Sequence, residues 1–273
     1  MIVDCFTFFD EFDVLEIRLK ELSGVVDRFV LAEARQTFQG SPKPLYFQEN
    51  ATRFKQYLNK IEHLIVDLPE TDDPWVREGY QRNALKRAIG QLPRDATVFI
   101  SDVDEIFRPS AMREAASRGH FVFVEMDLYY YFLNLRSKGA KWVKPYCGPA
   151  AEIMAIEDFS LPRWRELQYL QERNLPQDST VRSGGWHFSW LASRILNKLD
   201  SFSHTEMRIW MERRGEIEAA VTKGDKFFVT GESLERAGLQ ELPVTVQKEY
   251  RRLRRAGYFW KPMPWYRRIR KLK

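Results

Sequence analysis

Two aspartates, Asp102 and Asp104, follow an apolar run in the segment VFISDVDEIF. Successive residues of a strand point to opposite faces, so residues two apart would project to the same side where the strand leaves its sheet. Two neighbouring carboxylates repel each other unless a cation lies between them, and a hard divalent ion with phosphate oxygens is the natural neutraliser. The spacing therefore predicts a site for a hard divalent ion together with a diphosphate.

Two other interpretations of this motif stay open. Aspartate is common at helix starts, so the pair could merely cap the following turn and helix. Haloacid-dehalogenase-type phosphoryl transfer also uses D-x-D after a strand with Mg²⁺, but there the motif usually lies in the first strand with Thr or Val two residues further on. Here it follows the fourth expected strand and Ile106 takes that place, so the sequence fits this chemistry poorly.

The elements around the motif alternate in type. Apolar runs of strand length occupy residues 2–9, 27–34, 62–69 and 97–107. Helical patterns are expected at residues 11–26, 51–60, 73–92 and 110–118. This order predicts an α/β fold, a Rossmann-related, mostly parallel sheet with helices on both faces. Sheets of this kind bind ligands beyond the carboxyl ends of their strands.

Two later segments carry further signals. The run FVFVEMDLYYYFLNLR is too long and aromatic for one central strand, so we expect it to bend or split. The segment GGWHFSWL predicts another strand, in which glycines permit close backbone approach to His187. Trp186 and Trp190 flank this histidine, and either ring could stack on a sugar. A histidine in an aromatic strand could equally be a hydrogen-bonded core residue.

Composition places the chain among folded soluble proteins. It has 273 residues, of which 44% are hydrophobic and 30% charged. The two cysteines, Cys5 and Cys147, allow neither a disulfide framework nor a cysteine-based zinc site, so a reducing compartment fits best. The N-terminus lacks a basic signal-type segment and no window approaches 18 uninterrupted apolar residues. We therefore expect a cytoplasmic location.

The basic charge lies at one end of the sequence. Residues 248–273 hold eleven Lys and Arg against the single Glu249, whereas the whole chain is only +5. We expect one domain over residues 1–245 and a basic aromatic tail over 246–273. Cations interleaved with aromatic rings suit an anionic membrane surface, at the inner face of the membrane. A peripheral membrane or nucleic-acid binding protein acting through this tail is the alternative function, and a solvated charged end is the plainest interpretation.

Several motifs in one order resemble glycosyltransferase family 17. They are EFDVLEIRLKELSGVVDRFVLAEARQTFQGSPKPLYF, REGYQRNALKRAI, ISDVDEIFRP and GGWHFSWL, and the likeness spans roughly residues 2 to 215. The resemblance implies a GT-A fold, an inverting reaction, a UDP-sugar donor such as UDP-GlcNAc or another UDP-hexose, and Mn²⁺ or a similar ion. The acceptor implied here is a glycan or lipid-linked saccharide.

The resemblance also suggests roles for the motif and its neighbours. Asp104 is expected to coordinate the metal directly, while Asp102 shares the ion or holds the ribose and bound water. Glu105 could orient arginine or backbone partners, or could be a solvent-facing acid. His187 is a candidate third ligand of the metal, and His204 has a weaker claim.

Donor contacts are expected from three further places. Arg77 and Arg82 precede the motif strand on a helix and could reach the diphosphate, although Glu78 and Arg82 could instead form an ordinary i,i+4 ion pair. The end of the first strand, Thr7 to Glu11, falls where such folds usually hold the uridine. Glu33, at the end of the second strand, could accept from the base or ribose or could pair with the nearby Arg35.

An inverting transfer needs a general base that deprotonates the acceptor hydroxyl. That base should be an acid on the acceptor side, and the candidates are Asp127, Glu152, Asp158 and Asp178. We lean weakly to Glu152, because it follows the loop CGPA.

Overall fold

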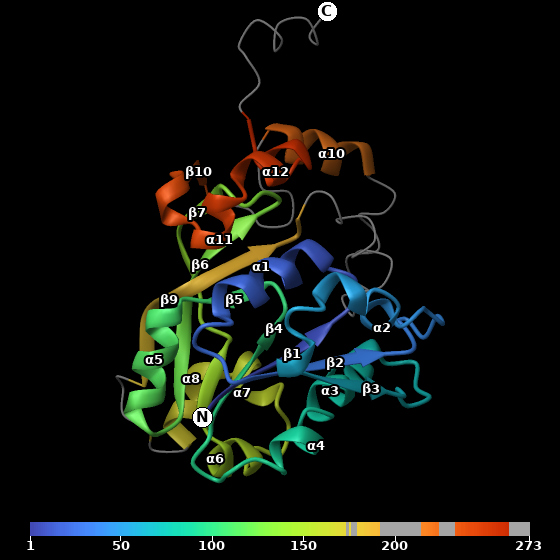
Figure 1. Cartoon of the computed structure of the whole chain (residues 1–273), viewed down its shortest axis with the longest axis vertical. Helices are drawn as coiled ribbons and strands as arrows, with labels where there is room; N and C mark the ends of the chain where they lie inside the picture. The colour runs from blue at the N-terminus through green and yellow to red at the C-terminus, as the bar shows by residue number, and fades with distance from the viewer. Residues whose placement is uncertain (173–174, 176–178, 192–213, 224–232, 262–273) are drawn as a thin grey trace, which may run out of the picture.

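The computed structural model describes residues 1–172, 175, 179–191, 214–223 and 233–261 (Figure 1). Its strands are β1 (Ile2–Phe8), β2 (Arg28–Ala34), β3 (Ile61–Val66), β4 (Thr97–Asp102), β5 (Glu105–Phe107), β6 (Val122–Tyr130), β7 (Leu135–Trp142), β8 (Tyr146–Pro149), β9 (Thr180–Ser189) and β10 (Leu234–Arg236). Its helices are α1 (Phe12–Leu22), α2 (Tyr46–Glu49), α3 (Pro74–Asn83), α4 (Lys86–Ile89), α5 (Pro109–Arg118), α6 (Ala150–Met154), α7 (Leu161–Trp164), α8 (Glu166–Glu172), α10 (Arg214–Lys223), α11 (Val244–Lys248) and α12 (Tyr250–Arg255).

One sheet runs through the molecule in the order β10-β7-β6-β8-β4-β1-β2-β3. Within it, β3, β2, β1 and β4 form a parallel block, and β6 pairs in parallel with β9. Antiparallel pairs enter where β8 joins β4 and β6, and where β5 joins β9. The expected α/β class is confirmed, because each connection within the parallel block passes through helical segments.

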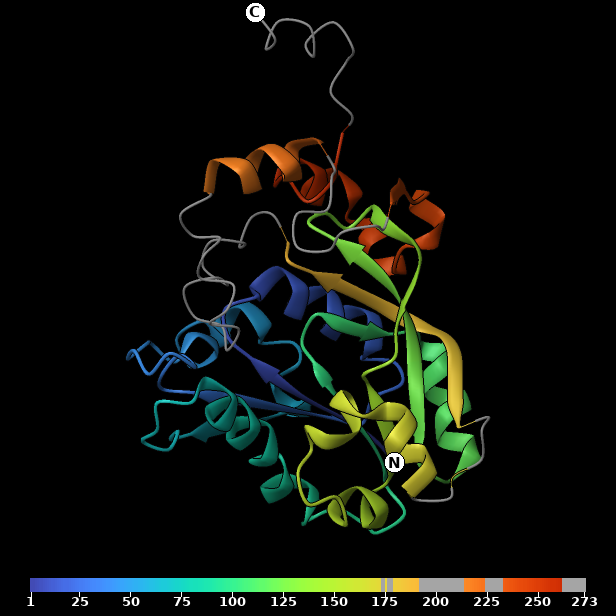
Figure 2. The ribbon, with the colours of Figure 1, turned by 180° about the vertical axis from the view of Figure 1, so that it is seen from behind.

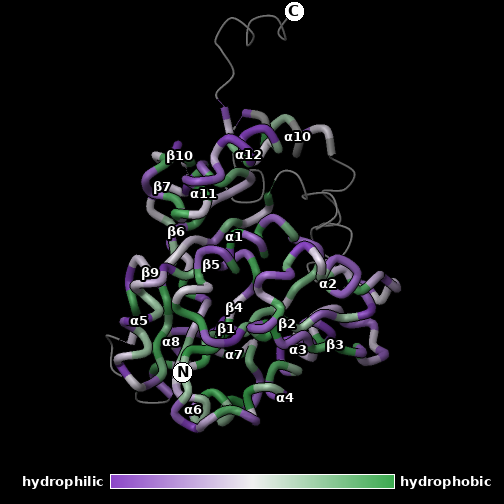
Figure 3. The backbone as a smooth tube through the Cα atoms, viewed as in Figure 1, coloured by the Kyte–Doolittle hydropathy of each residue, from purple (hydrophilic) through white to green (hydrophobic). Residues whose placement is uncertain are grey.

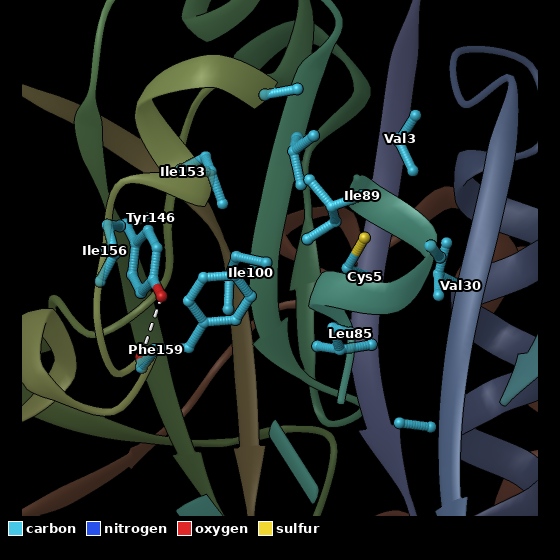
Figure 4. Close-up of a cluster of buried hydrophobic side chains, with 14 of the residues drawn as sticks. Val3, Cys5, Val30, Leu85, Ile89, Ile100, Tyr146, Ile153, Ile156 and Phe159 are labelled. Atoms are coloured by element: carbon cyan, nitrogen blue, oxygen red, sulfur yellow. Dashed lines mark hydrogen bonds between the residues drawn. The ribbon is translucent and has the colours of Figure 1, made fainter. Parts of the chain in front are cut away.

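The odd-numbered residues of β1 face one layer of helices. Val3 and Cys5 share a buried cluster with Val30 of β2, with Ile100 of β4, and with Leu85, which lies just before α4. Figure 4 shows these side chains facing one another across the sheet and helix layer. In the same cluster the Tyr146 hydroxyl donates to the Phe159 carbonyl oxygen at 2.9 Å, which ties β8 to the segment before α7.

The even-numbered residues of β1 face the opposite layer. Phe6 and Phe8 pack with Leu15, Leu19 and Leu22 of α1. In Figures 1 and 2 α1 lies above the strands of the parallel block, and α3, α4 and α6 lie below them. Helices on both faces of the sheet are therefore confirmed, and strand alternation decides which residue meets which layer.

Two local expectations had different outcomes. The long aromatic run does split, into β6 and β7, and Tyr131 takes a φ of 63° at the corner between them. The segment 51–60 does not form one helix; it forms two short 3₁₀ turns, Ala51–Phe54 and Leu58–Lys60. Phe54 is its fully buried side chain, so packing against the body does not support a continuous helix there.

Much of the basic C-terminal region packs on α1. Although α12 is largely hydrophilic along the chain (Figure 3), Leu253, Tyr258 and Phe259 are buried with Val14 and Ile17. The expected tail therefore begins inside a folded layer that extends to residue 261, and residues 262–273 lie outside the described part of the chain.

Polar contacts hold the same layer. The Tyr258 hydroxyl donates to Asp13 at 2.6 Å, and Arg252 pairs with Asp13 at 3.2 Å.

Within the described residues, no helix has both the length and the apolar content that crossing a membrane would require.

Candidate functional site

A cavity of about 240 Å³ opens beyond the carboxyl ends of β1 and β4. This is the edge of the sheet at which the parallel strands were expected to bind a ligand. Its lining includes Thr7, Glu11, Arg82, Asp102, Asp104 and His187. The structure thus brings six of the residues singled out in the sequence to one site.

Asp102 ends β4 on the face that carries α3. Thr7 is its register partner in β1, and the Thr7 hydroxyl lies 3.3 Å from Asp102 Oδ1. Arg82 of α3 donates to Oδ1 at 2.6 Å, and Arg163 of α7 donates to Oδ2 at 2.6 Å. The carboxylate that was expected beside a metal is thus bound by two guanidinium groups.

Both arginines are buried, so their charge needs compensation. Burial, the largest single influence, would lower the pKa of Arg82, but attraction to Asp102 and Glu78 together with the hydrogen bond to Asp102 raises that pKa on balance. In the same way, Asp102 and Glu105 overcome burial and raise the pKa of Arg163. The expected i,i+4 pair is also present, because Arg82 donates to Glu78 at 2.9 Å. Both guanidinium groups are therefore held charged at the cavity wall.

Glu105 is fully buried behind the motif. Its carboxylate accepts from both outer nitrogens of Arg163, at 2.9 and 2.8 Å, and from the Asp102 backbone N–H at 2.7 Å. Trp142 Nε1 also donates to it, at 2.5 Å. The expectation that Glu105 orients arginine and backbone partners is confirmed, and the solvent-facing alternative is excluded.

Arg18 of α1 fixes the motif from the opposite layer. It is fully buried and pairs with Asp4 of β1 through Nε at 2.8 Å and Nη2 at 2.5 Å. Its Nη1 donates to the carbonyl oxygens of Asp102, Val103 and Glu105, at 2.9, 3.3 and 2.8 Å. One guanidinium group therefore holds the turn that carries Asp104 in place through these hydrogen bonds.

Asp104 and His187 face each other across the cavity wall. His187 Nε2 lies 3.7 Å from Asp104 Oδ1, and the two side chains are 7% and 10% exposed respectively. The pairing of β5 with β9 places them, because Glu105 aligns with His187 and the Phe188 N–H donates to the Asp104 carbonyl at 2.9 Å. The Trp142 ring packs on the imidazole, with 4.4 Å between ring centroids.

The glycines before His187 act as expected. A Cβ built on Gly185 would lie 2.3 Å from the Ile106 carbonyl oxygen, so only glycine lets β9 approach β5 this closely. The flanking tryptophans differ. Trp186 is buried and donates to the Glu241 carbonyl at 2.8 Å, which makes it a core residue, whereas Trp190 lines the cavity with a φ of 52°.

Two residues expected at the donor lie outside the cavity lining. Glu33 is fully buried on the α1 face, where it accepts from the Phe47 N–H at 3.1 Å and contacts His63 Nε2 at 3.0 Å. Arg77 donates to the Phe38 carbonyl at 2.8 Å and also to Thr71, so it ties together two loops. Of the two helix arginines, Arg82 is the one that reaches the site.

The expected base candidates do not gather at the site. Glu152 is exposed on α6 and accepts from the Phe121 N–H at 2.8 Å. The start of α6 pairs with the start of β4, because the Ala150 N–H donates to the Ala96 carbonyl at 2.8 Å. A six-residue strand, about 20 Å of chain, therefore separates Glu152 from Asp102. This corrects the weak preference for Glu152.

The remaining candidates have other partners or lie in undescribed segments. Asp127 pairs with Lys141 at 2.5 Å and Arg108 at 3.4 Å, and Asp158 accepts from the Asn83 amide at 3.0 Å. Neither aspartate lines the cavity. Asp178 and His204 fall outside the described residues.

Sequence reasoning missed three contributors to the site. Arg18 carried a signal, because it lies within the apolar face of its helix between Leu15 and Leu22. Arg163 and Trp164 carried none, since the segment around them has no clear period. Trp164 lines the cavity together with Trp75 of α3.

Few side chains of the cavity could coordinate a metal ion. Among the described residues there is no group of three or more His, Cys, Asp or Glu side chains arranged for a metal. Asp104 and His187 supply one carboxylate and one imidazole. A cation of the Mg²⁺ type is commonly bound by one or two carboxylates with the rest of its shell from phosphates and water. The residues therefore fit an ion that a diphosphate would share.

Comparison with known proteins agrees with these features. Residues 1–230 match glycosyltransferase family 17. The β-1,4-mannosyl-glycoprotein 4-β-N-acetylglucosaminyltransferases of Homo sapiens and Mus musculus are 25% and 24% identical to this chain over 214 residues. These alignments cover 66% of this chain and 38% of each relative, so the chain spans less than two fifths of their length.

Two solved structures with similar folds cover about two thirds of this chain. The inositol-1-phosphate CTP transferase from T. maritima has a TM-score of 0.38 at 12% identity, covering 69% of this chain and 85% of that one. HddC from Yersinia pseudotuberculosis has a TM-score of 0.39 at 12% identity, covering 67% and 90%. Neither supports a functional argument at that score. The family match is different, because it includes every element that builds the cavity, and the chain belongs to glycosyltransferase family 17.

Proposed function

We propose that this chain transfers a sugar from a UDP-sugar donor to a saccharide acceptor in the cavity beyond β1 and β4. The observation that carries the proposal is the meeting of Asp104 and His187 with the buried arginines Arg82 and Arg163 on one cavity wall. That combination suits a diphosphate and a divalent ion. Membership of a glycosyltransferase family supplies the reaction class.

The proposed donor site divides into three parts. Asp104 and His187 would hold Mn²⁺ or Mg²⁺, which would stabilise negative charge on the departing UDP. Arg82 and Arg163, held charged by Asp102, would attract the diphosphate through the field they place at the wall. The β1 end from Thr7 to Glu11 would meet the uridine in a GT-A-type arrangement, and the names of the relatives favour GlcNAc as the transferred sugar.

An inverting reaction requires a base within reach of the acceptor hydroxyl. The described acids on the cavity lining are Asp10, Glu11, Glu78, Asp102 and Asp104. We assign Asp102 and Asp104 to the metal and diphosphate, and Asp10 and Glu11 lie in the segment proposed to meet the uridine, so Glu78 is the acid of this lining left on the acceptor side. Glu11 already accepts from the backbone N–H groups of Phe9 and Asp10, at 3.2 and 3.1 Å, which orients it toward the turn after β1.

The alternative function through the basic C-terminal region gains no support from the described residues. Tyr258 and Phe259 are buried, so these rings do not face a membrane headgroup layer. Arg252 is paired with both Asp13 and Glu249. Attachment to lipid-linked acceptors through residues 262–273 stays a proposal for the undescribed end.

Calorimetric titration of UDP and a panel of UDP-sugars tests the proposal. We expect binding that requires Mn²⁺ or Mg²⁺ in the wild type and is lost in Asp104→Asn. Transfer of radiolabelled sugar to a mixed glycan acceptor pool should be lost in the same variant. Glu152→Gln is the matched control, because it also removes one carboxylate but at the far end of β4, and it should bind the donor as the wild type does.

Circular dichroism and thermal melting would establish that each variant is folded. A folded wild type that binds no nucleotide with or without metal would overturn the proposal. So would an Asp104→Asn variant that retains metal-dependent binding.

A further inference from the structure

Two tryptophans form a corner at the mouth of the cavity. Trp75 of α3 and Trp164 of α7 have ring centroids 5.2 Å apart and planes at 82° to each other. Trp164 is 54% exposed, which is unusual for so large an apolar side chain. Both rings line the same cavity as Asp102 and Asp104. The chain therefore maintains an exposed aromatic surface beside its most charged wall.

The corner is fixed from below. Trp75 follows the start of α3, where Asp73 accepts from its N–H at 2.8 Å and Pro74 takes the first helical position. At the other end of α3, Asn83 donates to Asp158 at 3.0 Å and accepts from the Phe159 N–H at 2.9 Å. The segment leading into α7 is thereby tied to α3, and the two rings sit on elements that are joined to each other.

The short helix α7 joins the corner to the charged site. Arg163 points inward and binds Asp102 and Glu105, while its neighbour Trp164 lies at the rim. A shift of the α7 backbone would therefore disturb a buried ion pair, which holds the backbone of Trp164 in place. A group whose backbone is held in advance loses less conformational entropy on binding.

Burial separates the cavity into a deep part and a rim. The side chains of Asp104, His187 and Arg163 are each 10% exposed or less, whereas Trp164 is 54% exposed. A volume of about 240 Å³ is below the usual range for a small-molecule pocket, about 300 to 1,000 Å³. A bound nucleotide-sugar would fill the deep part, so a second substrate arriving from solvent must lie against the rim.

We propose that Trp75 and Trp164 form an acceptor subsite that binds a pyranose ring of a saccharide by stacking. This proposal rests on the proposed function, because it assumes that the UDP-sugar occupies the deep part of the cavity and leaves the rim to the acceptor. The apolar C–H face of a pyranose suits an aromatic ring, and polar groups on the same lining, including Glu78, Gln36 and Lys144, suit its hydroxyls. A saccharide satisfies both chemistries at once.

A printed array of defined oligosaccharides, probed with labelled protein in the presence of UDP and Mn²⁺, tests the subsite. We expect the wild type to bind a subset of the saccharides and Trp164→Ala to bind them about tenfold more weakly, as loss of one aromatic contact implies. Trp164→Phe, which keeps a ring, should recover most of the binding. Calorimetric binding of UDP should be unchanged in both variants.

Tyr80→Ala is the matched control. Tyr80 is 51% exposed on the same helix α3 but does not line the cavity, so saccharide binding should be unaffected by its loss. Thermal melting of each variant would separate loss of binding from loss of fold.

The outcomes distinguish this proposal from the one on which it rests. Saccharide binding that survives in Trp164→Ala, or no saccharide binding by a protein that binds UDP, would overturn the subsite. A fall in UDP affinity in Trp164→Ala would assign the corner to the nucleotide and also overturn it. Saccharide binding that depends on Trp164 in a protein that binds no UDP would instead retain the subsite and remove the donor proposal.

Discussion

Two charge clusters flank the D-x-D turn, one on each face of the sheet. The closed cluster consists of Asp4, Arg18 and Ser101, and each of these residues is fully buried. The open cluster consists of Arg82, Asp102 and Arg163, and the Asp102 side chain is 32% exposed to the cavity. Both clusters centre on an aspartate–arginine pair with contacts of 2.5 to 2.8 Å.

Strand alternation separates the two clusters. On β4, Ser101 faces α1 and meets Arg18, while the next residue, Asp102, faces α3 and meets Arg82. In the closed cluster, Arg18 donates its hydrogen bonds to other groups of the protein, including three carbonyl oxygens of the turn. The open cluster places its charges where a ligand could share them. Similar pairs thus support the turn on one side and the proposed chemistry on the other.

The largest effect is expected from breaking the closed cluster. Arg18→Ala would leave the Asp4 carboxylate buried without its partner and would remove a donor from three carbonyl oxygens. Removing one member of a buried pair costs about 3 to 5 kcal/mol, so we expect the free energy of unfolding to fall by that amount. Urea denaturation monitored by tryptophan fluorescence measures this change in the free energy of unfolding.

The double variant Asp4→Leu with Arg18→Met sharpens this prediction. It removes the uncompensated charge as well as the pair, so part of the lost stability should return. The turn would still lack its donor, and binding of UDP should stay impaired. A loss below about 1 kcal/mol in Arg18→Ala would contradict the structural role given to the closed cluster.

Replacing Arg163 should cost less stability than replacing Arg18, but it should weaken UDP binding directly. In Arg163→Met, Asp102 keeps Arg82, and Glu105 keeps the Asp102 N–H and Trp142 as donors. We therefore expect a fall of about 1 to 3 kcal/mol in the free energy of unfolding. Binding of UDP should weaken more than about tenfold, because one cation of the cavity wall is lost.

Arg163→Lys separates charge from geometry at this position. Lysine keeps the charge but cannot bind Asp102 and Glu105 with one planar fork, so it should recover only part of the binding. Equal UDP affinity in the wild type and Arg163→Met would remove Arg163 from the proposed donor site.

Much of the fold could be predicted because its signals are local. The apolar runs and helical stripes gave the order of the elements, and the parity of β1 and β4 already assigns residues to faces. That parity could also have corrected Glu33, because it shares a face with Phe29 and Leu31 and so points toward α1 rather than toward the D-x-D motif.

The site was less predictable because its partners come from distant segments. Asp102 is compensated by Arg163, which lies 61 residues further along in a segment without periodicity. An isolated D-x-D indicates that its charge must be compensated, but it does not say whether arginine or a metal does so. The same limit applies to Glu152. The sequence shows that it follows the loop CGPA, but not that this loop lies at the opposite end of β4 from Asp102.

The smallest effect is expected at Lys43, which belongs to neither cluster but joins the cavity lining to buried Glu33. Its Nζ lies 3.6 Å from Glu33 Oε1, and burial lowers the pKa of Lys43 from the lysine value of 10.5 despite that carboxylate. Between the lowered pKa and 10.5, the unfolded chain binds a proton that the folded chain does not. Unfolding then takes up a proton, so stability rises with pH across this window.

Comparison with Lys43→Met isolates this contribution. The free energy of unfolding of the wild type, measured relative to that of the variant, should increase as pH rises from neutral toward 10.5, by less than about 1.4 kcal/mol for each unit by which the pKa is lowered. Urea titrations at several pH values measure the slope. A flat difference would mean that Lys43 keeps its charge as readily as a solvent lysine, and an opposite slope would mean that Glu33 dominates over burial. In either case the cavity would hold one more firmly charged cation beside the open cluster.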